Sequence, residues 1–389
     1  MNDVVVIGGG LGGLSIGIAL AQAGLEVTLL ESRQETTTDH WGFTLWPPAT
    51  RTLDSLGLID EVTGQACHLK ALRWLRADGR DWMSVNLENL SDLGKFIGIL
   101  PSKLDAVLKR GAIRNGLKII EGVKNWDYER KADKTFNFRI STTEAELLLS
   151  CKLIVGADGA KSAVRERIGV RVRKWRPPKQ IILTGIGGSL EFEESRQAIG
   201  NGWSGGSVSL GMGKSWLYSI VQQGYDRNRE EQIFDYGELD PQARAAMKEL
   251  NDVIEISPWS QRVRRWAVDG IILMGDAAHG ILPHLGLGGS LTLESIPVLT
   301  EIIVDSVRNN NTSCLILNKF QQRRSARVAY AQRISELWAL SMTHPSLRYI
   351  RDYNFKRLSK SPESLETFVR ELSLPKPVSA RTRLKVWLF

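Results

Sequence analysis

Runs of consecutive apolar residues that end in glycines and pass into a helical pattern recur along this chain. The first run, residues 4–7, leads into the glycine-rich stretch 8–13 and then into a helix with apolar positions at Ile16 and Leu20. A second apolar strand covers residues 26–30. Because uninterrupted apolar strands are typical of parallel sheets covered on both faces, this order predicts a β-α-β unit at the start of an α/β domain.

The same pattern returns twice further along. Residues 152–157 form an apolar strand that ends in Asp158 and Gly159, and residues 270–275 form another that ends in Asp276. Acidic side chains at the carboxyl ends of strands lie where open α/β sheets keep their ligands. For Asp158 there is a structural alternative, because aspartate is a common cap at the start of a helix.

A long helix is predicted at residues 291–308, with a kink at Pro297. Gly286, Gly288 and Gly289 stand before it and leave backbone N–H groups free to face a ligand at the positive end of the helix.

Between these units the pattern changes to short strands, at residues 69–86 and 173–263. The change predicts an α/β fold in which a Rossmann-type dinucleotide-binding domain is interleaved with a sheet-rich domain and followed by C-terminal helices. The first domain is predicted to take residues 1–68, 99–172 and 266–340, and the second to take residues 69–98 and 173–265.

The remaining residues, 341–389, are predicted to form a helical and basic tail. For the tail after Pro345, which closes with the basic and apolar run 381–389, a disordered end is preferred over an edge strand or a membrane-surface contact.

Composition agrees with an ordinary globular chain. Of 389 residues, 42 % are hydrophobic and 24 % are charged, and the length is enough for two domains. The three cysteines are far apart and match neither a disulfide framework nor a zinc site, so we expect no metal and a reducing, cytoplasmic setting. The pattern contains no export signal and no apolar run long enough to cross a bilayer.

The formal net charge is +8, and part of this excess is local. The basic residues that meet few acids are Lys161, Arg165, Arg167, Arg171, Arg173, Lys174, Arg176 and Lys179. A solvated surface is the preferred interpretation, and the alternative is a field that gathers an anionic nicotinamide cofactor, an acidic carrier or a membrane surface. Nucleic acid is not expected as a partner, because no basic motif with interleaved aromatic residues stands out.

Tryptophan is concentrated in the second sheet-rich segment, at Trp175, Trp203, Trp216 and Trp259. Packing in a core or between domains is the preferred role, and an aromatic-lined pocket for a small molecule is the alternative.

The first glycine turn has the spacing of a dinucleotide-binding site. Gly8 permits the tight turn, Gly10 lets the backbone approach a pyrophosphate, and Gly13 lets the helix lie close to the sheet. Glu31 follows the second strand and is placed to accept hydrogen bonds from an adenosine ribose, which favours FAD or NAD over a 2′-phosphorylated cofactor. The alternative is a tight turn that binds nothing.

Three signals stand in one order: the glycine turn with Glu31, then residues 157–159 leading to Arg165, then residues 275–279 followed by Pro283 and Gly286. Together they resemble the single-component FAD-dependent monooxygenases typified by para-hydroxybenzoate hydroxylase. The resemblance covers roughly residues 4–340, and the sheet-rich segments, which would bind substrate, add no motif to it.

The resemblance implies that the first turn holds the ADP half of FAD, that residues around Gly42 form a mobile-flavin loop, and that Asp158 and Gly159 serve FAD and a passing nicotinamide cofactor. Asp276 would bind the ribityl and pyrophosphate region, and the backbone of residues 283–289 would face the isoalloxazine. The residues assigned to FAD in this way are Gly8, Gly10, Gly13, Glu31, Arg33, Gly42, Asp158, Gly159, Asp276, Pro283, Gly286, Gly288 and Gly289.

Four positions depart from the family pattern. Pro101 replaces a usual Arg that contacts the cofactor, Pro48 a frequent Asn, Leu287 a frequent Gln and Ser295 a frequent Asp. These changes bear on FAD affinity and flavin movement more than on the fold.

The resemblance implies that NADPH or NADH reduces FAD, that O2 adds at flavin C4a, and that the hydroperoxide transfers one oxygen atom to an aromatic or olefinic substrate. Pro283 and His284 are the candidates for contact with substrate, whereas His279 is assigned a structural role. Two alternatives stay open: an FAD-dependent reductase or dehydrogenase, and a non-catalytic interaction protein. The substrate, the choice between NADPH and NADH, and the oligomeric state are not predicted.

Overall fold

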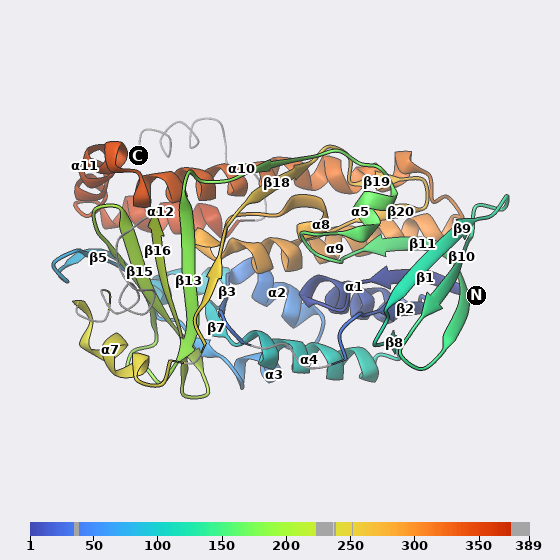
Figure 1. The fold of residues 1–389 in the computed structure, drawn as a ribbon, viewed down its shortest axis with the longest axis horizontal. Helices are drawn as coiled ribbons and strands as arrows, with labels where there is room; N and C mark the ends of the chain where they lie inside the picture. The colour runs from blue at the N-terminus through green and yellow to red at the C-terminus, as the bar shows by residue number, and fades with distance from the viewer. Residues whose placement is uncertain (35–38, 223–235, 237–238, 251, 375–389) are drawn as a thin grey trace.

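The computed structural model describes residues 1–34, 39–222, 236, 239–250 and 252–374. Its elements form two large sheets side by side, bridged by long helices (Figure 1).

The first sheet has eight strands and a parallel centre in the order β20, β11, β1, β2, β8. Strand β19 pairs antiparallel with β20, and the hairpin of β9 and β10 extends β11 on its other half. The strands are β1 (Asn2–Ile7), β2 (Val27–Leu30), β8 (Lys118–Ile120), β9 (Asn125–Arg130), β10 (Phe136–Ser141), β11 (Glu146–Gly156), β19 (Ala267–Val268) and β20 (Ile271–Leu273). The three predicted strand-and-glycine units therefore lie next to one another in the sheet, with their carboxyl ends at one edge.

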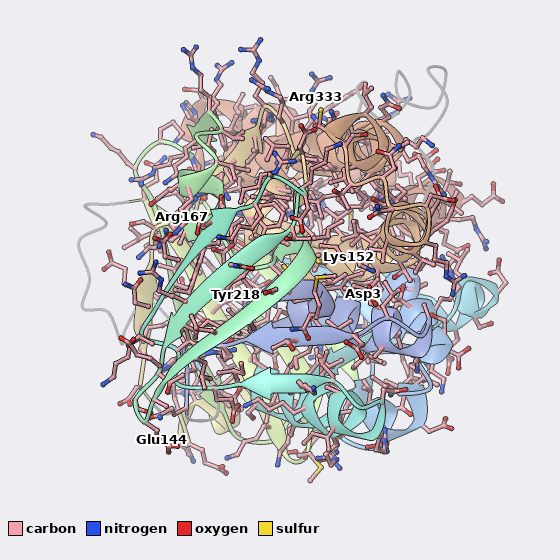
Figure 2. All side chains as sticks on the ribbon, turned by 90° about the vertical axis from the view of Figure 1, so that its right-hand side faces the viewer. Asp3, Glu144, Lys152, Arg167, Tyr218 and Arg333 are labelled. Atoms are coloured by element: carbon pink, nitrogen blue, oxygen red, sulfur yellow. The ribbon has the colours of Figure 1, made fainter. Side chains whose placement is uncertain are left out.

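Pairing within the first sheet is reinforced at the surface by charge. Lys152 on β11 lies beside Asp3 on β1, with Nζ 2.7 Å from Oδ1 (Figure 2). Arg167, which lies outside the sheet, donates to Asp127 on β9 at the same distance and covers the Trp126 ring. Pairs this exposed contribute little stability, about 0 to 1 kcal/mol each. The buried strands, in which Val4, Val5 and Val6 are fully enclosed, supply most of the stabilisation.

The second sheet has seven strands in the order β17, β13, β16, β15, β14, β5, β6. Its strands are β5 (Ala71–Arg76), β6 (Asp81–Asn86), β13 (Gln180–Gly187), β14 (Glu194–Ile199), β15 (Trp203–Gly211), β16 (Lys214–Gln222) and β17 (Ile254–Ile256). A tight turn joins β5 to β6, which pair antiparallel, and β5 also pairs in parallel with β14. The division into two interleaved domains stays a proposal, which this pairing of distant segments supports.

Two small sheets connect the large ones. They contain β3 (Phe43–Leu45), β4 (Cys67–His68) and β7 (Ile97–Ile99) in one, and β12 (Val172–Trp175) and β18 (Ser260–Val263) in the other. The proposed domain boundary at residues 98/99 falls inside β7.

Helices cover the sheets and join them. They are α1 (Leu11–Gln22), α2 (Pro47–Ser55), α3 (Ile59–Thr63), α4 (Pro101–Arg114), α5 (Ala163–Arg167), α7 (Pro241–Met247), α8 (Asp276–His279), α9 (Leu287–Arg308), α10 (Cys314–Thr343), α11 (Arg348–Leu358) and α12 (Pro362–Leu372), with short 3-10 turns η1 (Leu87–Leu93), η2 (Pro283–Leu285) and η3 (Pro345–Leu347). Helix α10 runs along both large sheets, and α9 lies beneath it against α1 and α2 (Figure 1).

The predicted start of the long helix was late, because its glycines were treated as residues before the helix. Helix α9 begins at Leu287 rather than residue 291, and α4 begins at Pro101. Gly288 and Gly289 therefore lie in the first turn of α9 instead of before it. Proline is well tolerated at the first helical position, where its missing N–H has no helical partner.

The preference for a disordered end after Pro345 was wrong as far as Leu372, because α11 and α12 form there and bury apolar side chains such as Phe355 and Val369. The closing run 381–389 lies outside the described residues.

Helix α9 is long and apolar enough to cross a membrane by length and composition, but 61 % of its apolar window is buried within the protein. It is therefore a core helix in this structure. The cytoplasmic setting stays a prediction.

Candidate active site

The glycine turn between β1 and α1 has no room for side chains at two of its three motif positions. Gly8 has a φ of +104°, and a β-carbon there would lie 2.5 Å from the Ala157 carbonyl oxygen. A β-carbon on Gly13 would lie 1.7 Å from the Gly8 oxygen. At Gly10, by contrast, a β-carbon would meet no described atom within 4 Å, so open space adjoins the start of α1.

This open space faces unsatisfied backbone donors. Gly10 is the N-cap of α1, and no described side chain caps that end of the helix. The first N–H groups of a helix have no partner within it and carry partial positive charge, so this end suits an anion such as a pyrophosphate.

Glu31 lies at the end of β2, beside this turn. Its Oε2 accepts a hydrogen bond from the Gly9 N–H at 2.5 Å, and its Oε1 accepts from the Arg33 N–H at 2.8 Å and from Arg33 Nε at 3.1 Å. Burial raises the pKa of Glu31, but the hydrogen bonds from Arg33 and Gly9 outweigh it, so the pKa lies below its usual value. The carboxylate stays ionised and can accept further hydrogen bonds from a ribose.

Asp158 is placed both to cap a helix and to bind a ligand. Its Oδ2 accepts from the Val164 N–H at 3.0 Å and so caps α5 together with Ser162, which accepts from the Arg165 N–H at 2.9 Å. Its Oδ1 is buried and has no hydrogen-bond partner among the described residues. An unpaired buried acceptor is costly, so this oxygen is available to a ligand.

Arg165 ties the second motif to the third. It is buried, unlike the other members of the local basic cluster, and donates to the Ala277 carbonyl at 3.1 Å and to the Ala160 carbonyl at 2.9 Å. Its role in the structure is therefore to hold the turn after β11 against α8.

Asp276 is the first residue of α8 and opens into a cavity. Its side chain is exposed to this cavity, and desolvation by the cavity walls raises the pKa of its carboxyl group. Gly275 before it has a φ of +55°, a conformation that glycine adopts at no cost.

The loop from Pro283 to the start of α9 forms one side of the same cavity. Gly286 has a φ of +62° and is the N-cap of α9, where no described side chain caps the helix. The N–H groups of Leu287, Gly288 and Gly289 therefore lie at a second uncapped helix N-terminus.

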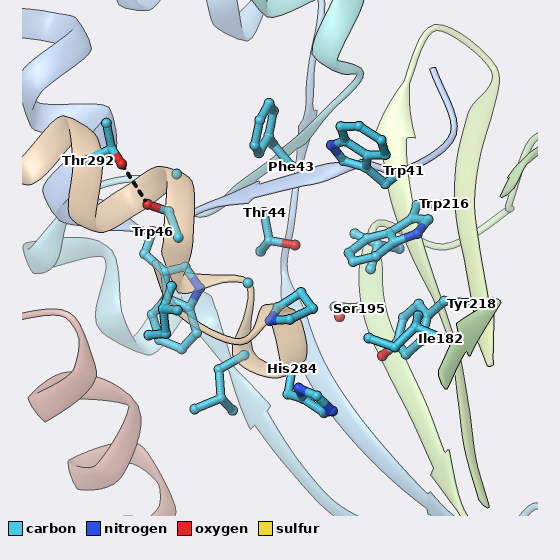
Figure 3. Close-up of a pocket in the computed structure, with 18 of the residues that line it drawn as sticks. Trp41, Phe43, Thr44, Trp46, Ile182, Ser195, Trp216, Tyr218, His284 and Thr292 are labelled. Atoms are coloured by element: carbon cyan, nitrogen blue, oxygen red, sulfur yellow. Dashed lines mark hydrogen bonds between the residues drawn. The ribbon is translucent and has the colours of Figure 1, made fainter. Parts of the chain in front are cut away.

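The cavity has a volume of about 490 Å³ and extends from the glycine turn to the second sheet and to α12. Figure 3 shows Trp41, Trp216 and Tyr218 on one side of it and Trp46 on the other. The predicted site residues that line it are Gly10, Gly42, Gly159, Asp276, Pro283, His284, Gly286, Gly288 and Gly289. Gly8, Gly13, Glu31, Arg33 and Asp158 are not among its lining residues: the two glycines shape the turn, and the other three lie beside it.

Gly42 lies in the loop before β3, where this loop contacts the second sheet. A β-carbon there would lie 2.5 Å from Leu210 Cδ2 and 3.0 Å from Trp216 Cβ, so this loop packs directly on β15 and β16.

The two motif histidines differ in surroundings. His279 is buried against the Trp266 ring at a centroid distance of 4.9 Å, and burial lowers its pKa to about 4. His284 lines the cavity and forms no ion pair with a described residue, and burial lowers its pKa to about 3. Both rings are neutral near pH 7, and only His284 borders the cavity.

Two of the four departures from the family pattern have local contacts that accommodate them. Pro101 is buried at the start of α4, where Asp39 accepts from the Ser102 N–H at 2.8 Å. Ser295 donates to the Leu291 carbonyl at 2.7 Å and accepts from Arg324. Whether these residues weaken FAD binding stays a prediction.

Sequence reasoning missed much of the cavity wall. Trp74 lies on β5, Trp338 on α10 and Phe368 on α12, and the segments that carry them share no motif. Among the tryptophans weighed as a possible pocket, Trp216 is the one that lines the cavity. Among the described residues, no group of three or more His, Cys, Asp or Glu side chains is placed to hold a metal ion.

These residues fit a dinucleotide with a flavin ring. Open space at Gly10, two uncapped helix ends and the unpaired Asp158 oxygen supply the donors and acceptors that such a molecule needs. Fold and site together define an α/β flavin-dinucleotide-binding enzyme.

The comparisons with known proteins give the family. Residues 1–334 match the model of the FAD binding domain family, so the chain belongs to this family and its cofactor is FAD. The predicted resemblance, the α/β fold and the FAD-dependent monooxygenase activity are confirmed.

Relatives match along almost the whole chain. The 2-heptyl-3-hydroxy-4(1H)-quinolone synthase of Pseudomonas aeruginosa is 23 % identical over 91 % of this chain and 96 % of its own. The 3-hydroxybenzoate 6-hydroxylase of Polaromonas naphthalenivorans is 24 % identical over 84 % of each chain. The structure of Klebsiella pneumoniae HpxO complexed with FAD and uric acid has a TM-score of 0.80 at 19 % identity and covers 97 % of this chain and 98 % of its own.

Proposed function

We propose that this enzyme uses NADPH or NADH and O2 to hydroxylate or epoxidise an aromatic or olefinic small molecule. The observation that carries the proposal is the continuity of the cavity, which runs from the glycine turn and Asp276 to aromatic side chains of the second sheet and α12. A flavin held at one end would thus border a largely apolar chamber at the other.

In this proposal the chain's own residues bind and orient. Gly8, Gly10 and Gly13 admit the pyrophosphate to the end of α1, and Glu31, with Arg33 beside it, accepts from the adenosine ribose. Asp158, Gly159 and Asp276 hold the centre of the cofactor, while Gly42 and the start of α9, with Gly286, Gly288 and Gly289, border the ring. Pro283 and His284 would face the substrate.

When bound, FAD accepts a hydride from the nicotinamide cofactor and activates O2 for transfer of one oxygen atom to the substrate. The protein excludes water from the aromatic chamber and fixes the substrate relative to the ring.

The relatives support an aromatic substrate. Their names refer to a quinolone and a hydroxybenzoate, both of which contain an aromatic ring. The alternatives of a reductase or dehydrogenase and of an interaction protein are not favoured by these comparisons.

Anaerobic reduction tests the proposal. FAD-loaded protein is mixed with NADPH or NADH, with and without an aromatic probe such as 2-naphthol, and the visible flavin absorbance is followed. We expect bleaching by one of the two nucleotides, faster with the probe present. Folded protein that retains no FAD, or retained FAD that neither nucleotide bleaches with any aromatic probe, would contradict the proposal.

A further inference from the structure

The cavity has only two formally charged side chains in its described lining, Arg73 and Asp276. Arg73 is the one cation among them, and two carboxylates hold it. Its Nε and Nη2 donate to Glu194 at 2.8 and 3.2 Å, and its Nη1 donates to Asp81 at 2.9 Å. A bidentate pair of this kind fixes the guanidinium and neutralises its charge.

The charged side chains around Arg73 do not leave an excess of positive charge beside the cavity. Glu194 also accepts from Arg196 at 2.9 Å, and Arg196 in turn donates to the buried Asp240 at 3.1 Å. Two guanidinium groups therefore meet three carboxylates in this cluster. At the other end of the cavity Asp276 forms no ion pair with a described residue, and its pKa is raised by burial rather than lowered by a nearby positive charge.

A carboxylate entering this cavity would lose its hydration without gaining an ion pair. Transfer of an unpaired charge from water into a mostly apolar site is strongly unfavourable. The cavity thus selects against anionic aromatic acids.

One acceptor in the cavity wall has no partner. His284 Nε2 lies 2.7 Å from Gln180 Oε1. The side-chain amide nitrogen of Gln180 donates to the Ala339 carbonyl at 3.2 Å and to Thr343 Oγ1 at 2.9 Å, which leaves its oxygen to face the histidine. An amide oxygen only accepts, so His284 carries its proton on Nε2.

This arrangement assigns the lone pair of the ring to Nδ1. That nitrogen is buried, and no described residue donates to it. Because burial lowers the pKa of His284 to about 3, the ring does not gain a second proton near neutral pH. Nδ1 is therefore an acceptor that a donor group on a bound molecule can satisfy.

Most of the other described residues in the wall are apolar or aromatic, although Ser195 and Gln197 also line it. Trp46 Nε1 and Trp338 Nε1 are buried donors in the wall without a described partner. Ile182 and Tyr218 lie across from His284 (Figure 3). Trp74 on β5, Trp338 on α10 and Phe368 on α12 complete the aromatic wall. The polar Thr184 in the same wall is already satisfied, since it donates to the His40 carbonyl and accepts from Trp216 Nε1.

We propose that the substrate is an uncharged aromatic molecule, a phenol or a ring N–H heteroaromatic, whose donor binds His284 Nδ1, and that aromatic carboxylates are excluded. This inference rests on the proposed function, because it names the substrate class of the same site. It also separates two chemistries that the relatives' names leave open, a neutral quinolone and a hydroxybenzoate.

Three probes of one ring system test it. 2-Naphthol carries a donor and no charge, 2-methylnaphthalene replaces the donor by a methyl group of similar size, and 6-hydroxy-2-naphthoate adds a carboxylate. Binding to the oxidised, FAD-loaded protein is measured by equilibrium dialysis near neutral pH. We expect 2-naphthol to bind about tenfold or more tightly than either of the others, because it alone supplies a donor to His284 Nδ1 without burying an unpaired charge.

A variant isolates the histidine. In His284→Phe, 2-naphthol should lose its advantage over 2-methylnaphthalene, while exclusion of the carboxylate should remain because it depends on Arg73 and Asp276. The matched control is His68→Phe at an exposed histidine outside the cavity, which should keep the wild-type order.

Equal or tighter binding of 6-hydroxy-2-naphthoate by the wild-type protein would overturn the proposal. So would equal binding of 2-methylnaphthalene, or failure of all three probes to bind. None of these measurements needs NADPH, O2 or turnover, so failure of the proposed function, seen as flavin that nicotinamide does not reduce, would be recognised separately.

Discussion

His279 and His284 are kept neutral by the protein around them. Burial lowers the pKa of His279 to about 4 and that of His284 to about 3, from an ordinary value of 6.5. In the unfolded chain both rings would take up protons below pH 6.5. The folded state therefore loses stability relative to the unfolded state as the pH falls below 6.5 toward these lowered values.

Acid sensitivity should fall when His279 is replaced. Each histidine contributes up to about 1.4 kcal/mol of lost stability per pH unit in this range. The stability difference between pH 7 and pH 5, measured by urea unfolding of FAD-saturated protein, should therefore shrink by about 2 kcal/mol in His279→Gln. His68→Gln, at an exposed position, should leave that difference unchanged; the account is wrong if both variants behave alike.

Release of Arg73 should admit carboxylates. Asp81→Asn removes one of the two carboxylates that hold this guanidinium, at an exposed position on β6. We expect 6-hydroxy-2-naphthoate to bind about two- to fivefold more tightly while 2-naphthol changes little, because an exposed charge pair is worth only about 0.2–1 kcal/mol. Asp78→Asn is the control, since Asp78 pairs with Arg80 in the same hairpin. An unchanged affinity for the carboxylate would show that Arg73 does not set the charge preference.

Asp158 and Ser162 separate capping from cofactor binding. Both accept from N–H groups at the start of α5, but only Asp158 has an unpaired buried oxygen. Ser162→Ala loses its cap and should cost about 1 kcal/mol of stability, whereas Asp158→Asn keeps a capping oxygen and should cost little. Only Asp158→Asn should also weaken FAD binding, by about tenfold in a fluorescence titration. Equal FAD affinities in Asp158→Asn and Ser162→Ala would show that Asp158 caps the helix and does not bind the cofactor.

Helix α12 forms a wall of the substrate cavity and is held by a buried arginine of α10. Arg327 donates to the Leu372 carbonyl at 2.6 Å and lies 3.3 Å from Glu294 on α9. Arg324 also pairs with Glu294, at 2.7 Å. This cluster joins the helix that begins at the cofactor site to the helix that closes the substrate chamber.

Loss of this connection should affect substrate more than cofactor. Arg327→Met leaves Glu294 paired with Arg324 but removes the donor to α12, so we expect a stability loss of about 1–3 kcal/mol and weaker binding of 2-naphthol, with FAD retained. The control, Arg323→Met, breaks an exposed pair with Glu301 and should cost no more than about 1 kcal/mol. Unaltered 2-naphthol binding in a folded Arg327→Met protein would contradict this role for α12.

At the scale of the whole molecule, local features were the predictable ones. The roles of Gly8 and Gly13 follow from the spacing of the motif, because neither position in this turn has room for a β-carbon. The strands of the first sheet were equally predictable, because a strand that is buried on both faces is an uninterrupted apolar run in the sequence.

Long-range pairing was not predictable in the same way. Strand β5 pairs in parallel with β14, more than a hundred residues later, and nothing in either strand specifies that neighbour or its register. For the same reason the contact between His284 and Gln180 was not foreseen, although His284 itself was singled out. The role of α12 in the cavity wall was missed because the apolar side of a helix does not say which distant segment it will pack against.

Labelled oxygen tests the central claim most directly. FAD-loaded protein is supplied with NADPH, ¹⁸O2 and a panel of uncharged phenols and ring N–H heteroaromatics, and products are analysed by mass spectrometry. The account predicts that a member of the panel gains one labelled oxygen atom in a reaction that requires FAD and NADPH. A product formed with consumption of NADPH but without the label would contradict it and would make the enzyme a reductase or dehydrogenase.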